Sequence, residues 1–267
     1  MSLYVTKHSI PQETRSLVSK RYHTITKAVN KEFWDSDSDT ANSLYVGSYG
    51  RGTAIDTSDL DVLVSLPQDQ FDYFNNLKGN SQSRLLQAVR SAILSTYPKT
   101  DVSADGQVVD VVFSDGMKFE ILPAFENTYC GVSLGSYTYA DTNNGGKWKS
   151  TFPKAEQAAM KKKNDESNGL LFDTCKHIRY IRDNYFSSCH LSGIVIDSFV
   201  FKAIGSWLWT PEGQTSSTPA GTYEKKLLDA FNIFFKRSDN IATPGSNQNI
   251  SFTDSRDTLG KVLNFMA

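Results

Sequence analysis

The sequence predicts an α+β fold with two parts. A long N-terminal helix and a mixed sheet flanked by helices form the first part, and a separate helical lobe follows. Three observations favour this fold class. Apolar residues recur at helical spacing over residues 11–33, short β-type runs with turn signals between them occupy residues 44–123, and helical spacing returns at residue 153. We therefore expect two domains, residues 1–152 and residues 153–267.

The elements of the first predicted domain follow one another at short intervals. Its long helix begins after Pro11 and ends before a polar segment at residues 35–42. The elements after it are, in order, a strand at 44–46, a strand at 60–66, a helix at 82–97 and a hairpin with strands at 108–113 and 119–122. We expect the hairpin turn at Asp115-Gly116 and the end of its second strand at Pro123.

The second predicted domain contains only helices. Its helices are expected at residues 153–163, 170–186, 195–209, 223–236 and 254–265. A loop rich in Gly, Pro, Ser and Thr separates the third from the fourth at residues 210–222.

Bulk properties exclude several functional classes. A net charge of -1 argues against constitutive binding to bulk nucleic acid, and no apolar run approaches the roughly 20 residues of a membrane-spanning helix. Three unpatterned cysteines predict buried, reduced thiols, and the N-terminal sequence lacks a secretory pattern, so we expect a cytoplasmic protein. The four histidines show no zinc-binding spacing, so oxygen atoms would hold any metal.

Residues 47–64 carry most of the functional information. Asp59 and Asp61 are two positions apart at the start of an apolar strand, so their side chains point to the same face and repel unless a cation lies between them. Hard divalent cations with oxygen ligands meet that need. The turn at Gly47-Ser48 offers backbone N–H groups and a hydroxyl to a phosphate. Metal and phosphate together indicate chemistry on a nucleoside triphosphate.

A two-metal phosphoryl-transfer site needs a third carboxylate, and the hairpin offers Asp110 and Glu120. A two-residue turn would make Asp110 face Ile121, on the opposite side of the sheet from Glu120, so only one of the two would face the aspartate pair. We favour Glu120, because an unpaired carboxylate on a central strand is costly and a metal would justify it. A three-residue turn would change the register, which leaves Asp110 as the alternative.

These motifs resemble the polymerase-β-like nucleotidyltransferase superfamily. The resemblance is carried by Gly47-Ser48, the Asp59-x-Asp61 pair, Phe119-Glu120-Ile121 and Pro123. The long first helix, the extended turn Gly-Ser-Tyr-Gly-Arg-Gly-Thr and the helical lobe make it most similar to the bacterial cGAS/DncV-like nucleotidyltransferases. The resemblance implies a polymerase-β-like nucleotidyltransferase core with its active site in the cleft between the core and the helical lobe.

The resemblance also implies roles for individual residues. The donor triphosphate would be held by Gly47 and Ser48, with Lys176 or Arg179 reaching it and Ser198 near the donor. Two Mg²⁺ ions, for which Mn²⁺ can substitute, would be bound by Asp59, Asp61 and Glu120. Two positions depart from the family pattern: the third carboxylate is Glu where Asp is commoner, and Lys202 stands where relatives often carry an acid.

The activity that the resemblance implies is non-templated joining of NTPs (ATP, GTP or both, with pyrimidine NTPs also open) into a cyclic or short linear second messenger. Pyrophosphate is released, and the role is bacterial anti-phage signalling, with any regulatory protein partner undefined. Two alternatives remain: a nucleotidyltransferase that modifies RNA, a small molecule or a protein, and a catalytically silent nucleotide sensor. The near-neutral charge argues against RNA tailing. The complete set of carboxylates argues against the sensor.

Overall fold

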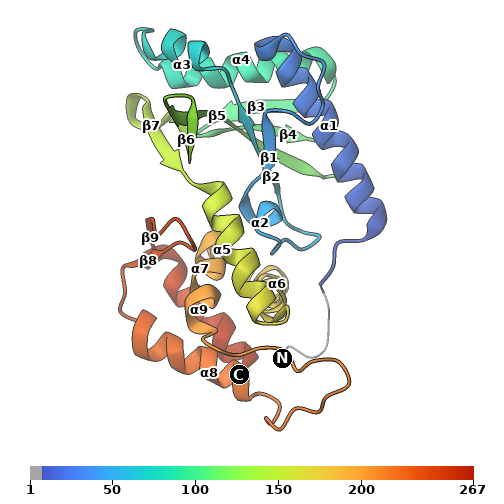
Figure 1. The fold of residues 1–267 in the computed structure, drawn as a ribbon, viewed down its shortest axis with the longest axis vertical. Coiled ribbons are helices and arrows are strands. Elements are labelled where there is room, and N and C mark those ends of the chain that lie inside the picture. Colours follow the sequence, from blue (N-terminus) through green and yellow to red (C-terminus); the bar gives the residue numbers. More distant parts are fainter. Residues whose placement is uncertain (1–7) are drawn as a thin grey trace. The chain divides into compact units, whose positions relative to one another are not determined.

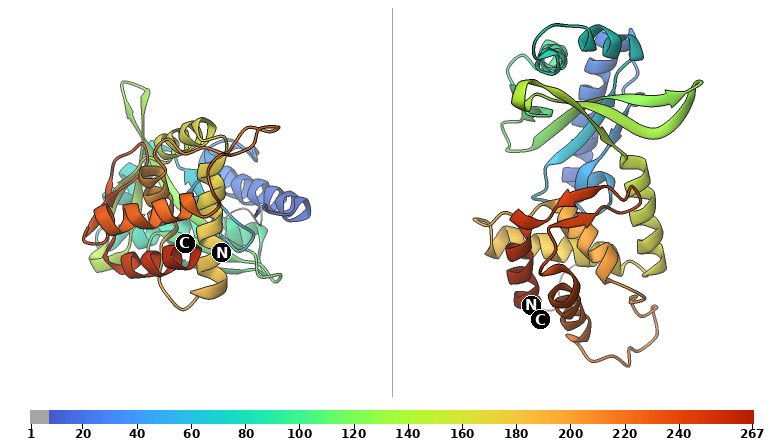
Figure 2. Two further views of the ribbon diagram at one scale, coloured as in Figure 1. Left: turned by 90° about the horizontal axis from the view of Figure 1, so that it is seen from below. Right: turned by 90° about the vertical axis from the view of Figure 1, so that its left-hand side faces the viewer.

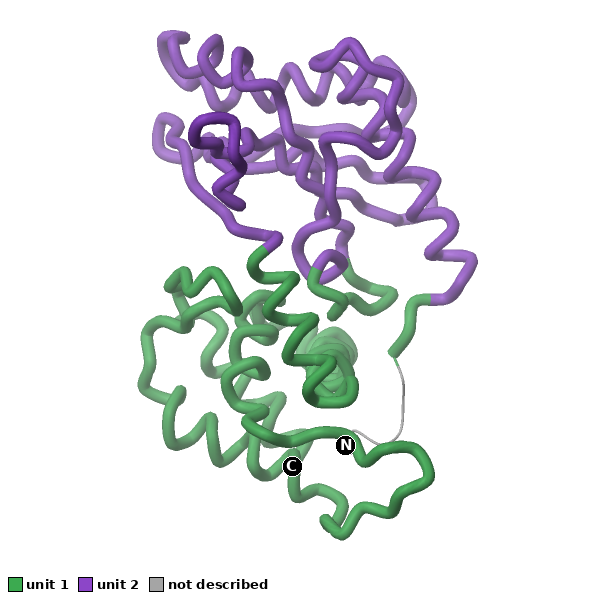
Figure 3. The backbone as a smooth tube through the Cα atoms, viewed as in Figure 1, with its two compact units in different colours: residues 1–10, 51–58, 155–267 green, residues 11–50, 59–154 purple. Residues whose placement is uncertain are grey.

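The computed structural model describes residues 8–267, which divide into two compact units (Figure 3). The sheet unit comprises residues 11–50 and 59–154. The helical unit comprises residues 155–267 together with residues 51–58 and, among the described N-terminal residues, 8–10. Residues 51–58 therefore belong to the helical unit, although the residues directly before and after them belong to the sheet unit.

The sheet unit is built on one mixed sheet. Its strands are β1 (Ser43–Tyr45), β2 (Leu60–Ser65), β3 (Asp101–Asp105), β4 (Val108–Val112), β5 (Lys118–Tyr129), β6 (Val132–Asp141) and β7 (Lys147–Thr151). The order is β1-β2-β5-β4-β3, with β6 pairing with both β5 and β7. The β2–β5 pair is parallel and the other pairs are antiparallel, so the predicted mixed sheet is confirmed.

Helices cover one face of this sheet (Figure 1). They are α1 (Gln12–Trp34) and α4 (Ser81–Thr96), with α3 (Gln68–Asn75) beside α4; the one-turn α2 (Gly47–Gly50) packs against β2. Alternate strand residues such as Val62 and Ile121 join the core beneath α1 and α4. Leu63 and Leu122 point the other way and belong to a smaller cluster on the opposite face. The side chains at 61 and 120 share that opposite face.

The helical unit has its own core. Its helices are α5 (Pro153–Glu166), α6 (Leu170–Tyr185), α7 (Gly193–Ala203), α8 (Thr222–Ala230) and α9 (Thr253–Met266), and a short hairpin pairs β8 (Asn240–Ala242) with β9 (Asn249–Ser251). A single π-helical turn, Phe231–Phe235, extends α8. Apolar side chains of all five helices form one cluster, in which Ile178, Phe199 and Leu259 are fully enclosed.

Several predicted boundaries were wrong for local reasons. The strand expected to end at Pro123 continues to Tyr129, because Pro123 falls between the last residue paired with β4 (Ile121) and the first paired with β6 (Ala124), where a missing N–H is tolerated. The helix expected at 195–209 ends at Ala203, just before Gly205 adopts a positive φ of 57°. Helix α3 and five strands (β3, β6, β7, β8 and β9) were not predicted from the sequence.

The hairpin formed by β5 and β6 continues beyond the other strands (Figure 2). Its turn contains Cys130, whose exposure contradicts the expectation that all three cysteines are buried. Cys175 is buried and Cys189 half-buried, and all three thiols are free. Within residues 8–267, none of the helices combines the length and the apolar character needed to cross a bilayer.

Candidate active site

Three carboxylate side chains lie in register on three neighbouring strands. Asp61 on β2 pairs with Glu120 on β5, and Glu120 pairs in turn with Asp110 on β4. Directly paired residues on neighbouring strands project from the same face of a sheet. The flanking residues at these positions belong to the core beneath α1 and α4, so the three carboxylates project from the opposite face.

The predicted hairpin register was therefore wrong by one residue. The N–H of Phe113 donates to the carbonyl oxygen of Met117 at 2.9 Å, which leaves a three-residue turn at 114–116 instead of a two-residue turn. Gly116 takes the left-handed position that such a turn requires, with a φ of 87°. As a result Asp110 and Glu120 lie directly opposite each other and share a face.

The strand order nevertheless distinguishes the two carboxylates. Glu120 lies on the strand next to β2, whereas Asp110 lies one strand further away. Neighbouring strands are about 4.8 Å apart, so the backbone at Asp110 is roughly twice as far from Asp61 as the backbone at Glu120. The strand order thus favours Glu120 as the carboxylate that acts with Asp61.

Lys118 supplies positive charge to this row. Its Nζ lies 2.6 Å from Oε1 of Glu120 and 3.2 Å from Oδ1 of Asp110. Burial works against the charge of Lys118, but hydrogen bonds and attraction from Glu120 and Asp110 outweigh it and raise the pKa of the ammonium group. One lysine thereby relieves the repulsion between two facing carboxylates.

The Gly47-Ser48 turn lies against the carboxylate of Asp61. The N–H of Val46 donates to the backbone oxygen of Asp61 at 2.9 Å, which holds the turn to β2. A Cβ on Gly47 would overlap the Asp61 carboxylate, and the φ of Gly47 is 56°. Ser48 is half-buried in the same turn, and Asp59 is exposed immediately before β2. The sheet unit therefore contains five of the predicted site residues: Gly47, Ser48, Asp59, Asp61 and Glu120.

The donor chemistry of this face suits a hard divalent cation. Carboxylates and a hydroxyl offer only oxygen atoms, which Mg²⁺ prefers. Among residues 8–267, however, no three histidine, cysteine, aspartate or glutamate side chains are grouped so that they could hold one ion. For Glu120 to share an ion with the aspartates, its carboxylate has to exchange Lys118 for that ion.

The predicted residues of the helical unit differ in accessibility. Arg179 is only 1% exposed, and its guanidinium binds both carboxylate oxygens of Asp197 at 2.7 and 2.9 Å. Ser198 is fully buried, and its Oγ has no hydrogen-bond partner among the described residues. Neither arrangement supports the expected contact with a nucleotide. Lys176 is partly exposed, so it stays the predicted triphosphate contact of this unit.

The helical unit also contains a buried polar cluster that was not predicted from the sequence, which we call the Asp197 cluster. Its members are Arg51, Thr53, Glu156, Arg179 and Asp197. Asp197 accepts hydrogen bonds from Arg51, Thr53 and Arg179, and Arg51 also donates to Glu156. One signal was available in the sequence: a single aspartate within the apolar run 194–200, where an ionised side chain needs a buried partner.

Burial and the neighbouring charges shift the pKa values of both acids in the Asp197 cluster. Burial opposes ionisation of Asp197, but Arg179 and Arg51 outweigh burial and lower the pKa of Asp197 to about 2. Burial raises the pKa of Glu156, and Arg51 opposes that shift only in part. At neutral pH the cluster therefore keeps Asp197 ionised between two guanidinium groups.

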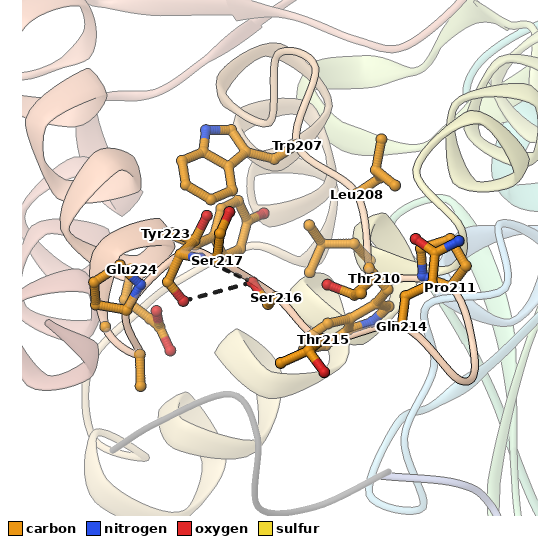
Figure 4. A pocket seen from close by; sticks show the side chains of 16 residues that line it. Trp207, Leu208, Thr210, Pro211, Gln214, Thr215, Ser216, Ser217, Tyr223 and Glu224 are labelled. Carbon is orange, nitrogen blue, oxygen red and sulfur yellow. Dashed lines mark hydrogen bonds between the residues drawn. The ribbon is translucent and has the colours of Figure 1, made fainter.

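A cavity of about 320 Å³ lies elsewhere in the helical unit, beneath the loop at 207–221 (Figure 4). Its walls include the aromatic residues Trp207, Trp209 and Tyr223 and several hydroxyl groups of the loop. None of the predicted site residues lines it. It is therefore separate from the carboxylate row.

Gly47→Ala tests a catalytic role for Asp61: the new Cβ displaces the Asp61 carboxylate, and misplacement of a reacting group by about 1 Å is expected to lower turnover by about a hundredfold. The backbone at a positive φ adds about 1–2 kcal/mol of destabilisation. Gly79→Ala is the matched control: Gly79 has a φ of 80° and open space around it, so this variant carries the backbone cost alone. Initial rates and thermal unfolding of both variants are the measurements; equal rate losses would contradict the steric argument.

A mixed sheet with carboxylates in register beside a glycine-serine turn, together with a unit of five helices, is the architecture of polymerase-β-like nucleotidyltransferases. Residues 4–164 match the SMODS family, the Second Messenger Oligonucleotide or Dinucleotide Synthetase domain. The chain belongs to this family and is a nucleotidyltransferase of the cGAS/DncV-like type, as the sequence motifs predicted. No curated protein sequence matches the chain at a significant level.

Solved structures of this type share the fold over almost the whole chain. The Elizabethkingia meningoseptica CdnE cyclic dinucleotide synthase, with GTP and Apcpp, aligns with a TM-score of 0.63 at 14% identity and covers 96% of this chain and 97% of its own. The Rhodothermus marinus CdnE c-UMP-AMP synthase, with Apcpp and Upnpp, aligns at 0.60 and 15% identity, covering 96% of each chain. CdnG of Bradyrhizobium diazoefficiens, in complex with GTP, aligns at 0.64 and 12% identity, covering 96% and 85%. At these identities the likeness establishes the fold.

Proposed function

We propose that this protein joins NTPs into a cyclic or short linear oligonucleotide messenger by two-metal catalysis, as part of bacterial anti-phage signalling in the cytoplasm. The observation that carries the proposal is the register of Asp61 with Glu120 beside the Gly47-Ser48 turn, since it brings oxygen ligands and phosphate-binding groups together. Membership of a family of second-messenger synthetases supports the choice of product class.

Each round of the proposed reaction forms one bond and breaks one bond. The 2′- or 3′-hydroxyl oxygen of an acceptor nucleotide attacks the α-phosphorus of a donor NTP. The bond from that phosphorus to the oxygen leading to the β-phosphate breaks, and pyrophosphate and the hydroxyl proton leave. The backbone of Gly47 and the hydroxyl of Ser48 bind the donor triphosphate. A second round within the same product closes a ring.

The metal ligands in this proposal are Asp59, Asp61 and Glu120. Two Mg²⁺ ions, or Mn²⁺ in their place, would supply activation of the attacking hydroxyl and neutralisation of the leaving pyrophosphate. Until they bind, Lys118 holds the carboxylate of Glu120 through a contact of 2.6 Å. ATP and GTP are the proposed substrates, and the nucleotides bound by the similar synthases from Elizabethkingia and Bradyrhizobium support that choice.

Mass spectrometry of the products formed from all four NTPs with Mg²⁺ or Mn²⁺ tests the proposed function. A phosphatase-resistant oligonucleotide formed without added acceptor supports it. Products that appear only when RNA, a small molecule or a protein is added would instead indicate an enzyme of another substrate class. Nucleotide binding without any turnover would indicate a sensor.

Separate replacement of the two facing carboxylates tests the third ligand. Glu120→Gln is expected to reduce product formation about a hundredfold or more, because it removes a charged ligand on the strand next to Asp61. Asp110→Asn is the matched control in the same row, and we expect it to retain activity within tenfold, since Asp110 lies one strand further from Asp61. Steady-state rates over a Mg²⁺ titration are the measurement. The reverse order of losses would assign the third ligand to Asp110.

A further inference from the structure

Residues 51–58 connect the two parts of the sequence that carry the proposed chemistry. The segment starts three residues after Ser48 and ends immediately before Asp59. Both of those residues belong to the sheet unit, whereas the segment itself belongs to the helical unit. Chain connectivity therefore makes the position of the segment a constraint on Ser48 and on Asp59.

Arg51 anchors the front of the segment. It is 8% exposed, its Nε donates to Oδ2 of Asp197 at 2.8 Å, and its Nη1 donates to Oε2 of Glu156 at 3.2 Å. Thr53, which is fully buried, donates its hydroxyl to the same oxygen of Asp197 at 3.0 Å. Gly52 between them has a φ of 77°, and a Cβ there would collide with the ring of Phe172. The chain at 51–53 thus has little freedom to move.

The rear of the segment is also fixed. Ile55 is 2% exposed, its N–H donates to Oγ of Ser58 at 3.1 Å, and its carbonyl accepts from the N–H of Ser58 at 3.0 Å. The hydroxyl of Thr57 donates to Oδ2 of Asp183 on α6 at 2.7 Å. These bonds form a closed turn directly ahead of Asp59.

The acceptor that holds Arg51 is itself held independently. Arg179 on α6 binds both oxygens of Asp197, and Nη2 of Arg179 also donates to the carbonyl of Gly193 at 2.9 Å. Removing Arg51 therefore leaves Asp197 paired with Arg179 and keeps the contact between α6 and α7, while Glu156 on α5 loses Arg51 and keeps the hydroxyl of Ser246 at 3.4 Å. This separation makes Arg51 a testable position.

We infer that Arg51 is a positioning residue for nucleotidyl transfer: through Asp197 and Glu156 it fixes residues 51–58 and so holds Ser48 and Asp59 in their reactive places. The inference rests on the proposed function. Because reacting groups tolerate little misplacement, loss of this anchor lowers turnover far more than it lowers nucleotide affinity. Arg51 itself touches neither metal nor nucleotide in this role.

Hydrogen exchange tests the anchor without reference to activity. In Arg51→Gln, the amides of residues 51–58 are expected to exchange at least about tenfold faster than in the wild type, while those of α8 and α9 keep their wild-type rates. Arg51→Lys keeps a charge beside Asp197 and is expected to restore part of the protection. Leu227→Ala is the control: Leu227 is fully buried in the helical core, so its truncation destabilises the unit without touching the segment. Unchanged exchange of residues 51–58 in Arg51→Gln would overturn the inference.

Kinetics then test the positioning role, at a temperature where every variant is fully folded. We expect Arg51→Gln to lose about a hundredfold in kcat with less than a tenfold change in KM for NTP, Arg51→Lys to recover at least tenfold, and Leu227→Ala to stay within threefold of the wild type. Thr53→Val, a milder change to the same anchor, is expected to lower kcat several-fold and serves if Arg51→Gln does not fold. A loss in Arg51→Gln no greater than that in Leu227→Ala overturns the positioning role. If the wild type forms no product from NTPs, the proposed function fails, and the exchange result alone decides whether Arg51 anchors the segment.

Discussion

Changing Asp59 and Asp61 together to asparagine is expected to reduce product formation by about a thousandfold or more while leaving the protein folded. The two carboxylates provide most of the negative charge in the proposed metal site, and charge stabilisation by bound metal contributes several kcal/mol to such reactions. Each 1.36 kcal/mol corresponds to a factor of ten in rate, so the loss of about 4 kcal/mol gives a thousandfold decrease. Product formation from radiolabelled NTPs with Mg²⁺ is the measurement.

The asparagine pair is chosen because it keeps the shape of the site. The amide of Asn at position 61 occupies the volume beside Gly47 that the carboxylate now fills, so the Gly47-Ser48 turn keeps its packing. Asp72→Asn is the control, since Asp72 is an exposed aspartate on α3 of the same unit, and its rate is expected within twofold of the wild type. Turnover by the double variant above one tenth of the wild-type rate would exclude the metal assignment.

Local sequence patterns were sufficient for most of the individual elements near the site. The long α1, the short β1, the Gly47-Ser48 turn and the start of β2 all have signals within a few residues: helical spacing, a Gly-containing turn and an apolar run. These signals depend on contacts close in sequence, so no knowledge of the fold is needed to interpret them. Gly47 and Asp61 accordingly lie together, because the turn that contains Gly47 packs against β2, which contains Asp61.

The hairpin register needed information that the local pattern does not contain. Asp115-Gly116 is compatible with a two-residue turn and with a three-residue turn that includes Ser114, because Gly accepts the positive φ required by either. A shift of one residue moves every side chain of one strand to the other face. The prediction that Asp110 and Glu120 lie on opposite faces of the sheet was therefore wrong, although the strand order supports the choice of Glu120.

The partners of Asp197 could not be predicted, because they are distant from it in sequence. Arg51 and Asp197 are 146 positions apart, and nothing in the motif around Gly47-Ser48 indicates that Arg51 turns toward the helical unit. Lys176 or Arg179 was predicted to reach a triphosphate because the resemblance to the nucleotidyltransferase family implied a basic residue there. Here the charge of Arg179 is used to keep a buried aspartate ionised.

Asp197→Asn is expected to lower the free energy of unfolding of the helical unit by about 3–5 kcal/mol, because it leaves Arg51 and Arg179 buried without their shared counter-ion. Asp141→Asn provides the comparison in the sheet unit: Asp141 is also buried, but its partner Lys149 reaches solvent, so the expected loss is smaller. Urea unfolding followed by circular dichroism at pH 7 measures both. A loss below 1 kcal/mol in Asp197→Asn would mean that the two guanidinium groups find other partners.

The pH dependence of that loss identifies charge as its cause. The folded pKa of Asp197 lies near 2, below the unfolded value of 3.8, so its stabilisation is complete above pH 3.8 and disappears as the pH falls through 2. Glu156 acts in the opposite sense: its raised pKa gives stability that is complete below 4.5 and is lost as the pH rises through its folded value. Asp197 is one of the charges that raise the pKa of Glu156, so both proteins are compared in a Glu156→Gln background, where the difference made by Asp197→Asn is free of the Glu156 titration. The difference in free energy of unfolding is expected to be constant from pH 7 to about pH 4 and then to shrink. A difference caused by packing alone would persist to low pH.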